Sequence, residues 1–441
     1  MAARQQPQGL GWLGIVRLGT VQAAIGAMVM LATSLLNRVM VVEYSVAAAV
    51  PASLVAWHYA VQLTRPLWGH KSDQSRRRTP WIVGGMGILA FGAVLAVDAT
   101  ILMADPGFGA AILALLGFTM IGFGVGMSGT ALLALLASRV SAERKPAAAA
   151  ISWTMMIAGI VIAAGISGAY LDPFSEARLA IVSSLVVLVA FCLAMMALRN
   201  LEDRNPPVLQ PNNTGERQSF PDALREIWAE REARRFTFFV FISMLAYSMQ
   251  DLIMEPFAGF LFEMTPGEST QLSSIQHSGI LLGMLAAGLG GSLYTRYFGQ
   301  NLKLWIALGC TGSAVMLAGL SFAATQGTEW PLVANVFGLG VANGIFAVAA
   351  VGAMLGLASK GSGSAEGARM GVWGASQAIA FGIGGLTGAV LVDQLRAATG
   401  QDAAAFQFVF MAEAVLFIVA AIVAVGTTLA RSPVHERTFP A

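Results

Sequence analysis

The sequence predicts an all-α integral membrane protein with twelve transmembrane helices, arranged as two pseudo-repeated halves of six. Of its 441 residues, 56% are hydrophobic and only 11% are charged, whereas soluble domains carry about 25% charged residues. A membrane-spanning helix needs roughly 20 mainly apolar residues, so the chain is apolar enough for about twelve of them. This composition excludes a soluble enzyme, a disordered chain and a nucleic-acid-binding module.

Twelve apolar stretches of spanning length follow one another along the chain, separated by polar segments. Lipid offers the backbone no hydrogen-bond partners, so stretches this long and continuous are expected to be helices. The predicted spans cover residues 16–40, 45–66, 80–103, 109–138, 147–170, 179–198, 236–261, 274–295, 303–324, 331–357, 371–393 and 405–430. The first stretch is too long for the apolar core of a cleavable signal peptide, so we expect it to be the first span.

Lys and Arg are distributed unevenly between the two sides of the predicted membrane. With the N-terminus placed in the cytoplasm, the outside loops carry only Arg178 and Arg396. The cytoplasmic segments carry Arg4, Lys71, Arg76, Arg77, Arg78, Arg139, Arg144, Lys145, the basic residues of 199–235, Arg296, Lys303, Lys360, Arg369, Arg431 and Arg437. Because cytoplasmic loops are enriched in Lys and Arg, this pattern predicts that both termini lie in the cytoplasm.

The longest polar segment follows the sixth span and divides the chain. We predict an N-terminal six-helix half at 1–198, a cytoplasmic linker at 199–235, a C-terminal six-helix half at 236–430 and a cytoplasmic tail at 431–441. Residues 221–235 of the linker have the amphipathic pattern of a helix that lies on the inner membrane surface. Leu224, Ile227 and Trp228 share its apolar face.

The two halves resemble each other in sequence. Leu136-Ala137-Ser138-Arg139 in the fourth span is matched 221 residues later by Leu357-Ala358-Ser359-Lys360. At an offset of 220, the fifth span matches the eleventh, since Trp153, Gly165, Gly168, Ala169 and Leu171 correspond to Trp373, Gly385, Gly388, Ala389 and Leu391. A duplication of six spans is the architecture of the major facilitator superfamily, in which ligand sites lie near the midplane between the halves.

The loop after the second span resembles a second signature of that superfamily, G-x-x-x-D-R/K-x-G-R-R/K. The matching residues are Gly69, Asp73, Arg77 and Arg78, while two other positions of the motif differ. An ordinary basic cytoplasmic loop would also account for these residues.

Ionisable residues inside spans are costly and mark candidate functional positions. The first and seventh spans carry the same order of an amide, a charge and a glutamate, namely Asn37, Arg38 and Glu43 in one and Gln250, Asp251 and Glu255 in the other. Because these spans face each other in this architecture, we expect Arg38 and Asp251 to pair between the halves. The cluster is consistent with an interdomain latch, with ligand or proton handling, or with residues at the outer interface.

His58 and His277 lie in the equivalent second and eighth spans. A neutral imidazole is a good metal ligand, although each histidine could equally be a hydrogen-bonded structural residue. The G-x-G-x-x-G run at 124–129 lies inside a span with no preceding strand, so we interpret its glycines as helix-packing residues. The sequence contains no Walker loop and no catalytic constellation, and we expect neither a nucleotide cofactor nor enzymatic activity.

Two strings are more specific than the superfamily signatures: Leu36-Asn37-Arg38-Val39-Met40-Val41-Val42-Glu43 and Ser248-Met249-Gln250-Asp251-Leu252-Ile253-Met254-Glu255-Pro256-Phe257-Ala258-Gly259. Both resemble signatures of the PucC/LhaA family, also called the bacteriochlorophyll delivery family, of phototrophic bacteria. The resemblance extends over about residues 15–430 and includes Ser72-Asp73. The short basic loop at 69–80 is more similar to the branch labelled bacteriochlorophyll synthase 44.5 kDa chain than to the light-harvesting assembly members.

The resemblance implies a multi-pass protein of the bacterial inner membrane, cytoplasmic or photosynthetic, that binds or delivers bacteriochlorophyll and assists assembly of light-harvesting or reaction-centre complexes. The partners it implies are subunits of those complexes, pigment-synthesis enzymes and membrane lipids, with no nucleic acid. In that role His58 or His277 would ligate the pigment Mg, and the charged cluster would lock the halves or bind polar ring substituents. The helix at 221–235, with its apolar face of Leu224, Ile227 and Trp228, would dock partner proteins. Two other functions remain open: a proton-coupled small-solute transporter, and a pigment-free structural partner of an antenna complex.

Overall fold

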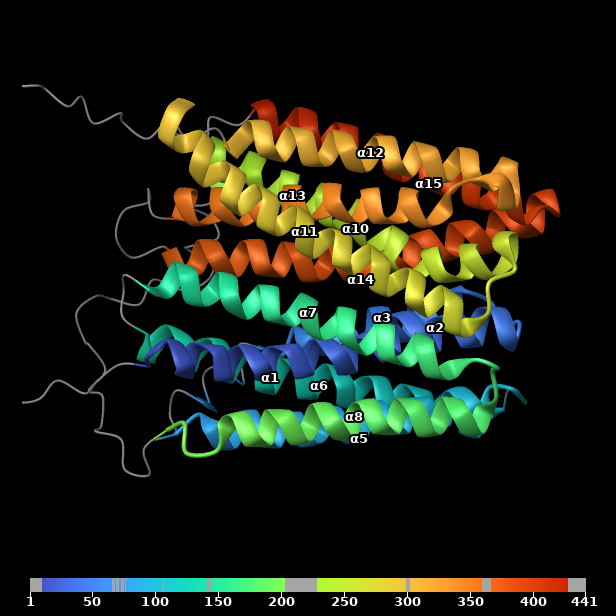
Figure 1. Ribbon diagram of the computed structural model, residues 1–441, viewed down its shortest axis with the longest axis horizontal. Coiled ribbons are helices and arrows are strands. Elements are labelled where there is room, and N and C mark those ends of the chain that lie inside the picture. The colour runs from blue at the N-terminus through green and yellow to red at the C-terminus, as the bar shows by residue number, and fades with distance from the viewer. Residues whose placement is uncertain are drawn as a thin grey trace, which may run out of the picture.

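In its described residues, the computed structural model contains twelve long helical segments that lie side by side (Figure 1). We call each of them a rod, whether it is one helix or several helical elements joined end to end. The structure describes residues 10–65, 68, 71–72, 75, 77–105, 107–140, 144–202, 228–298, 302–358 and 366–426. Within these ranges all regular elements are helical, which confirms the all-α class. We call the face at which α1 (Trp12–Met30) begins the inner face, and the opposite one the outer face, after the charge-based prediction.

The rods correspond one to one with the twelve predicted spans. The N-terminal half comprises α1 continued by η1 (Leu31–Leu35), α2 (Leu36–Arg38) and η2 (Val39–Glu43), then α3 (Ala49–Gln62), α5 (Thr79–Leu102), α6 (Phe108–Arg139), α7 (Lys145–Leu171) and α8 (Glu176–Leu198). The C-terminal half comprises α10 (Arg231–Phe262), α11 (Pro266–Phe298), α12 (Leu302–Gln326), η4 (Gly327–Glu329), α13 (Leu332–Ala358), α14 (Glu366–Thr399) and α15 (Asp402–Gly426).

Ten helices in the described part of the chain are long and apolar enough to cross a membrane. The rods outside this group are α3, which has 14 residues, and α11, whose outer part carries several polar side chains. Both lie in the middle of the bundle and contact the opposite half, where polar residues find protein partners instead of lipid.

The two halves share one packing pattern. In the N-terminal half, α1 contacts α7 and α8, while α3 and α5 contact α6; in the C-terminal half, α10 contacts α14 and α15, while α11 and α12 contact α13. Between the halves, α7 lies along α11 and α14 lies along α3. The fourth span therefore has the same position in its half as the tenth has in the other, and the fifth span corresponds to the eleventh in the same way. The sequence repeat predicts these two equivalences.

Close approach of neighbouring helices depends on glycine at particular points. A Cβ atom added to Gly340 of α13 would overlap the carbonyl oxygen of Gln276 on α11. A Cβ atom added to Gly124 of α6 would lie 2.5 Å from the backbone nitrogen of Leu89 on α5. The first glycine of the G-x-G-x-x-G run therefore serves helix packing, as the sequence predicts.

Gly340→Ala should destabilise the protein, because the added methyl group would overlap the backbone of α11. We expect the free energy of unfolding to fall by about 1–3 kcal/mol, the usual cost of overpacking. Gly87→Ala on α5 is the matched control, since a Cβ atom there meets no atom within 4 Å, and it should change stability by no more than about 1 kcal/mol. Thermal unfolding in detergent measures both variants, and equal melting temperatures would refute the close-packing account.

Candidate functional site

The first rod of the N-terminal half departs from a regular α-helix at two places. Residues Leu31–Leu35 and Val39–Glu43 form single π-helical turns. Such turns occur frequently at functional sites, and each inserts one extra residue that turns the subsequent side chains to a new direction. The polar residues predicted for the first span lie within and between these two turns.

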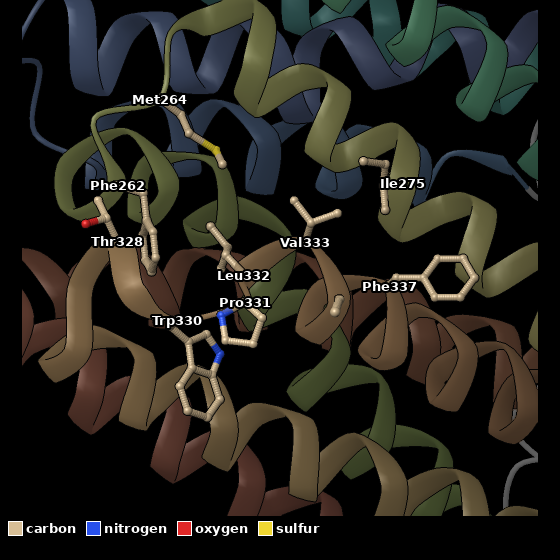
Figure 2. A pocket seen from close by; sticks show the side chains of 10 residues that line it. Phe262, Met264, Ile275, Thr328, Trp330, Pro331, Leu332, Val333 and Phe337 are labelled. Atoms are coloured by element: carbon tan, nitrogen blue, oxygen red, sulfur yellow. The ribbon is translucent and has the colours of Figure 1, made fainter.

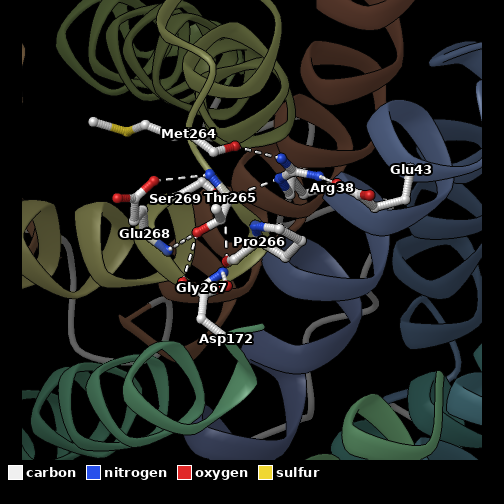
Figure 3. A network of polar contacts seen from close by, with 9 residues as sticks. All are labelled: Arg38, Glu43, Asp172, Met264, Thr265, Pro266, Gly267, Glu268 and Ser269. Carbon is white, nitrogen blue, oxygen red and sulfur yellow. Dashed lines mark hydrogen bonds and ion pairs between the residues drawn. The ribbon is translucent and has the colours of Figure 1, made fainter. Parts of the chain in front are cut away.

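Arg38 is a buried cation near the outer end of the contact between the halves, beside the segment that precedes α11 (Figure 3). Its side chain is 2% exposed. Its Nε donates to Ser269 Oγ at 3.0 Å, and one terminal nitrogen donates to the Met264 carbonyl at 2.7 Å. The other terminal nitrogen pairs with Glu43 at 2.5 Å. Two of these contacts therefore join the halves, while the ion pair stays within the N-terminal half.

Two further side chains of the same rod reach across the interface. Asn37 Nδ2 donates to the Leu252 carbonyl at 2.7 Å. Ser34 Oγ donates to the Glu255 carboxylate and lies 3.2 Å from Ser273 Oγ. We call this set the interdomain latch, and it consists of Ser34, Asn37, Arg38, Leu252, Glu255, Met264, Ser269 and Ser273.

The predicted pairing of Arg38 with Asp251 is wrong. Arg38 is held by Glu43 and by groups at the outer end of the C-terminal half. Asp251 lies one turn deeper along α10 than the latch carboxylate, where it lines a small cavity. Gln250 is fully buried, and its amide has no hydrogen-bond partner among the described residues.

A small cavity lies between the halves beside Asp251. Its volume is about 10 Å³, close to the least space that one water molecule occupies. Its other wall residues are Thr33, Val55, Tyr59, Ser248, Leu252, Phe381 and Gly385. Because these residues come from both halves, the cavity lies at the interface between them.

The two candidate ligand histidines have different surroundings. His58 is 2% exposed inside the N-terminal half, and its Nε2 lies 2.7 Å from the side-chain nitrogen of Gln62. His277 is 8% exposed, and its Nδ1 lies 2.9 Å from the Ser273 carbonyl. Donation from Nδ1 leaves the lone pair on Nε2, which is the form of imidazole that binds metals. His277 is therefore the better prepared ligand of the two.

The predicted cytoplasmic loop motif falls partly within the described residues. Gly69 and Asp73 lie outside them. Arg77 is half-buried, and a terminal nitrogen of Arg78 donates to the Ala134 carbonyl at 2.9 Å. The arginine thus ties the start of α5 to α6 at the inner face.

Glu202, which carries no clear signal in the sequence, holds the start of α5 beside the loop motif. Its carboxylate accepts hydrogen bonds from the backbone nitrogens of Arg78 at 2.9 Å and Thr79 at 2.7 Å, and from Thr79 Oγ1 at 2.6 Å. It therefore caps the first turn of α5, where backbone N–H groups have no partner within the helix.

The predicted docking helix also falls partly outside the described residues, which exclude Leu224 and Ile227. Trp228 is exposed, and its ring lies against Phe238 with centroids 5.9 Å apart. The helix α10 already begins at Arg231. The last five residues of the predicted surface helix are therefore the first residues of a spanning helix.

Two aspartates that the sequence analysis does not single out also connect the halves. Asp172 accepts hydrogen bonds at the start of α11, and Asp393 accepts hydrogen bonds at the start of α3. Each follows a matched leucine of the repeat, Leu171 or Leu391, within two positions. That recurrence is the sequence signal that identifies them.

An apolar groove lies near the outer end of the C-terminal half (Figure 2). Its volume is about 700 Å³. Phe262 of α10, Ile275 of α11 and Trp330 before α13 lie on its wall, together with Met264, Thr328, Pro331, Leu332, Val333, Ala334 and Phe337. The groove touches the interdomain latch at Met264, whose carbonyl accepts a hydrogen bond from Arg38.

Comparison with known proteins decides the family. The family model described as PUCC protein matches residues 35–432. The chain belongs to the PucC family. It is 48% identical over 434 residues to the bacteriochlorophyll synthase 44.5 kDa chain of Rhodobacter capsulatus, covering 98% of this chain and 99% of that protein. It is 30% identical over 433 residues to Protein PucC of Rhodobacter capsulatus, covering 92% and 90% respectively.

Two solved structures with the same fold are transporters. The nucleoside transporter NupG (D323A mutant) superposes with a TM-score of 0.67 at 15% identity, covering 94% of this chain and 99% of NupG. A bacterial homologue of the lysosomal transporter Spinster, in an inward-facing and unoccupied conformation, gives a TM-score of 0.69 at 13% identity, with 96% and 98% coverage. This PucC-family chain is therefore a multi-pass membrane protein with the fold of these transporters.

Arg38→Ala should destabilise the PucC-family chain more than Glu43→Gln does. The first change leaves two buried acceptors without a donor, Ser269 Oγ of α11 and the Met264 carbonyl in the segment before α11, which costs about 2–4 kcal/mol. The second weakens an ion pair whose carboxylate is 29% exposed, and such pairs contribute about 1 kcal/mol or less. Melting temperatures in detergent measure the difference, and a larger effect of Glu43→Gln would show that the latch is not the main contribution of Arg38.

Proposed function

We propose that the chain binds bacteriochlorophyll in the membrane and delivers it for assembly of light-harvesting or reaction-centre complexes, without catalysing a reaction itself. The observation that carries this proposal is the 48% identity, over nearly the whole chain, to a protein whose name includes bacteriochlorophyll synthase. The membership of the PucC family supports the same role. The expected partners are subunits of those complexes or pigment-synthesis enzymes.

The apolar groove is the part of the structure that suits the hydrocarbon tail of such a pigment. Its volume of about 700 Å³ lies within the range of roughly 300–1,000 Å³ for small-molecule sites, which are mostly lined by apolar and aromatic side chains. Aromatic rings and aliphatic groups form most of its wall (Figure 2). The wall residues include no histidine and no carboxylate, so the groove fits the tail of the pigment and not its Mg.

The Mg ligand that we propose is His277. It follows Ile275 of the groove wall by two positions on α11, which turns it about 200° around the helix and away from the groove. It lies one turn after Ser273, whose hydroxyl is 3.2 Å from Ser34 Oγ of the other half, so it lies on the face of α11 toward the interface. The cavity there is far smaller than a pigment ring, so binding at His277 requires that the halves separate.

Purification from a native photosynthetic membrane in mild detergent, followed by an absorption spectrum and pigment extraction, tests the proposal. We expect bacteriochlorophyll at a fixed ratio to protein. His277→Ala should lower that ratio several-fold, whereas His58→Ala should not, because His58 is enclosed inside the N-terminal half. Colourless protein that brings down antenna subunits would indicate a structural partner instead, and an equal loss in both variants would remove His277 as the ligand.

Ala334→Trp should lower pigment binding by filling the groove, because Ala334 is an exposed residue of its wall. Ala111→Trp on α6 is the matched control, since Ala111 is also exposed but lies in the other half. The pigment ratio of the two purified variants measures the effect. Equal ratios would show that the groove does not hold the pigment.

A second candidate function is proton-coupled transport of a small solute. The specific observation in its favour is the pair of carboxylates, Asp251 and Glu255, at the contact between the halves. Solute flux into proteoliposomes that depends on an imposed proton gradient would support this function. Pigment-free protein that shows such flux would replace the first proposal with the second.

A further inference from the structure

Asp172 connects the N-terminal half to the first turn of α11 at the outer face (Figure 3). Its carboxylate accepts hydrogen bonds from Thr265 Oγ1 at 2.6 Å and from the backbone nitrogen of Gly267 at 3.2 Å. The helix begins with Pro266, which has no N–H, so Gly267 supplies the first free donor. A Cβ atom on Gly267 would overlap the carboxylate, so glycine is what allows this close approach.

Asp393 makes the corresponding contact in the opposite direction. It lies near the outer end of α14, and its carboxylate accepts hydrogen bonds from the backbone nitrogens of Ala48 at 3.2 Å and Ala49 at 2.8 Å. These nitrogens belong to the first turn of α3. Asp393 and Asp172 are 221 residues apart, the same offset that relates the fourth and tenth spans.

The two contacts are equivalent under the pseudo-symmetry of the fold. The helices that carry the aspartates, α7 and α14, are equivalent, and so are α11 and α3, the helices that receive them. The first turn of a helix presents unpaired N–H groups and a partial positive charge. A carboxylate that accepts from these groups is a stabilising cap, and here each cap comes from the opposite half.

We propose that Asp172 and Asp393 form a reciprocal pair of helix caps that closes the outer face and that opens as a gate to the cavity beside Asp251. Both aspartates are half-buried, so water can replace each carboxylate when the halves part. Arg38 also remains paired after opening, because its partner Glu43 lies in the same half. Opening therefore leaves the Arg38 charge with its partner.

The test uses the full-length chain in right-side-out membrane vesicles, with a reporter cysteine at Thr33, which lines the cavity. Cys192 is exposed and is first replaced by alanine, whereas Cys310 is buried and is kept. A membrane-impermeant maleimide is added from outside, and mass spectrometry of the peptide that contains residue 33 gives its labelling rate. The reporter should label slowly when both caps are present.

D172A/D393A should raise the labelling rate of the reporter by about tenfold or more, because each lost cap weakens the closed state. D402A is the matched control, since Asp402 also lies at the outer face but pairs with Arg396 of its own half at 2.5 Å. It should leave the rate within about twofold of that of the reporter protein. No increase in the double variant, or an equal increase in D402A, would overturn the proposal.

A reversible disulfide across the gate distinguishes two causes of faster labelling, namely opening of the gate and misfolding of the variant. Asp172 and Thr265 are in hydrogen-bond contact, so D172C/T265C allows a disulfide across the same contact. In the D393A background, the oxidised protein should label slowly at residue 33 and the reduced protein quickly. Fast labelling in both states would overturn the proposal. No pigment is needed, so this outcome is independent of the proposed function.

Discussion

The arrangement of the two halves depends on hydrogen-bond partners for the buried guanidinium of Arg38, which lies where the halves meet. An unpaired arginine in a membrane interior is strongly unfavourable, and Arg38 is nearly inaccessible. Its hydrogen bonds to Ser269 and to the Met264 carbonyl can form only when the C-terminal half lies against the first rod. The N-terminal half alone therefore leaves hydrogen-bond donors of Arg38 without acceptors, and the C-terminal half supplies these acceptors. The ion pair with Glu43 meets part of this requirement within the N-terminal half alone.

The contacts between the halves differ with depth. At the outer end they are polar, with the latch and the two aspartate caps. Near the middle of these helices, Ile157 of α7 packs against Ile280 and Met284 of α11. Polar contacts with access to water can be exchanged for hydration, whereas deep apolar contacts cannot be exchanged in this way. This gradient favours movement at the outer face. The apolar groove lies next to this polar region, because Met264 belongs both to the groove wall and to the latch. The groove can therefore hold an apolar group while the interface between the halves stays closed.

The fold was predictable because its signal is spread over long segments. Apolar length, loop charge and the repeat each average over many residues, and together they give twelve helices in two halves. The site depends on local details that carry little sequence signal. Each π-helical turn in the first rod adds a residue and rotates the later part of the helix by about 100°. Only the turn at Leu31–Leu35 precedes Arg38, and the sequence gives no sign of it, so the direction of the Arg38 side chain could not be predicted. Asp172, Asp393 and Glu202 bind mainly backbone N–H groups. Such groups exist at the start of every helix, so the sequence does not show which helix each carboxylate contacts. Gly69, Asp73, Leu224 and Ile227 lie outside the described residues, so their predicted roles stay predictions.

The central claim is that Arg38 stabilises the closed arrangement through its contacts across the interface. A double-mutant cycle between Arg38 and Ser269 tests this most directly, using R38M, S269A and the combined variant in the full-length protein. Thermal unfolding in one detergent supplies the four stabilities. Residues that share a hydrogen bond usually show coupling of about 0.5–3 kcal/mol, and we predict a value in this range. Strict additivity of the two changes would contradict the claim, because it would mean that the two side chains contribute independently although they lie 3.0 Å apart.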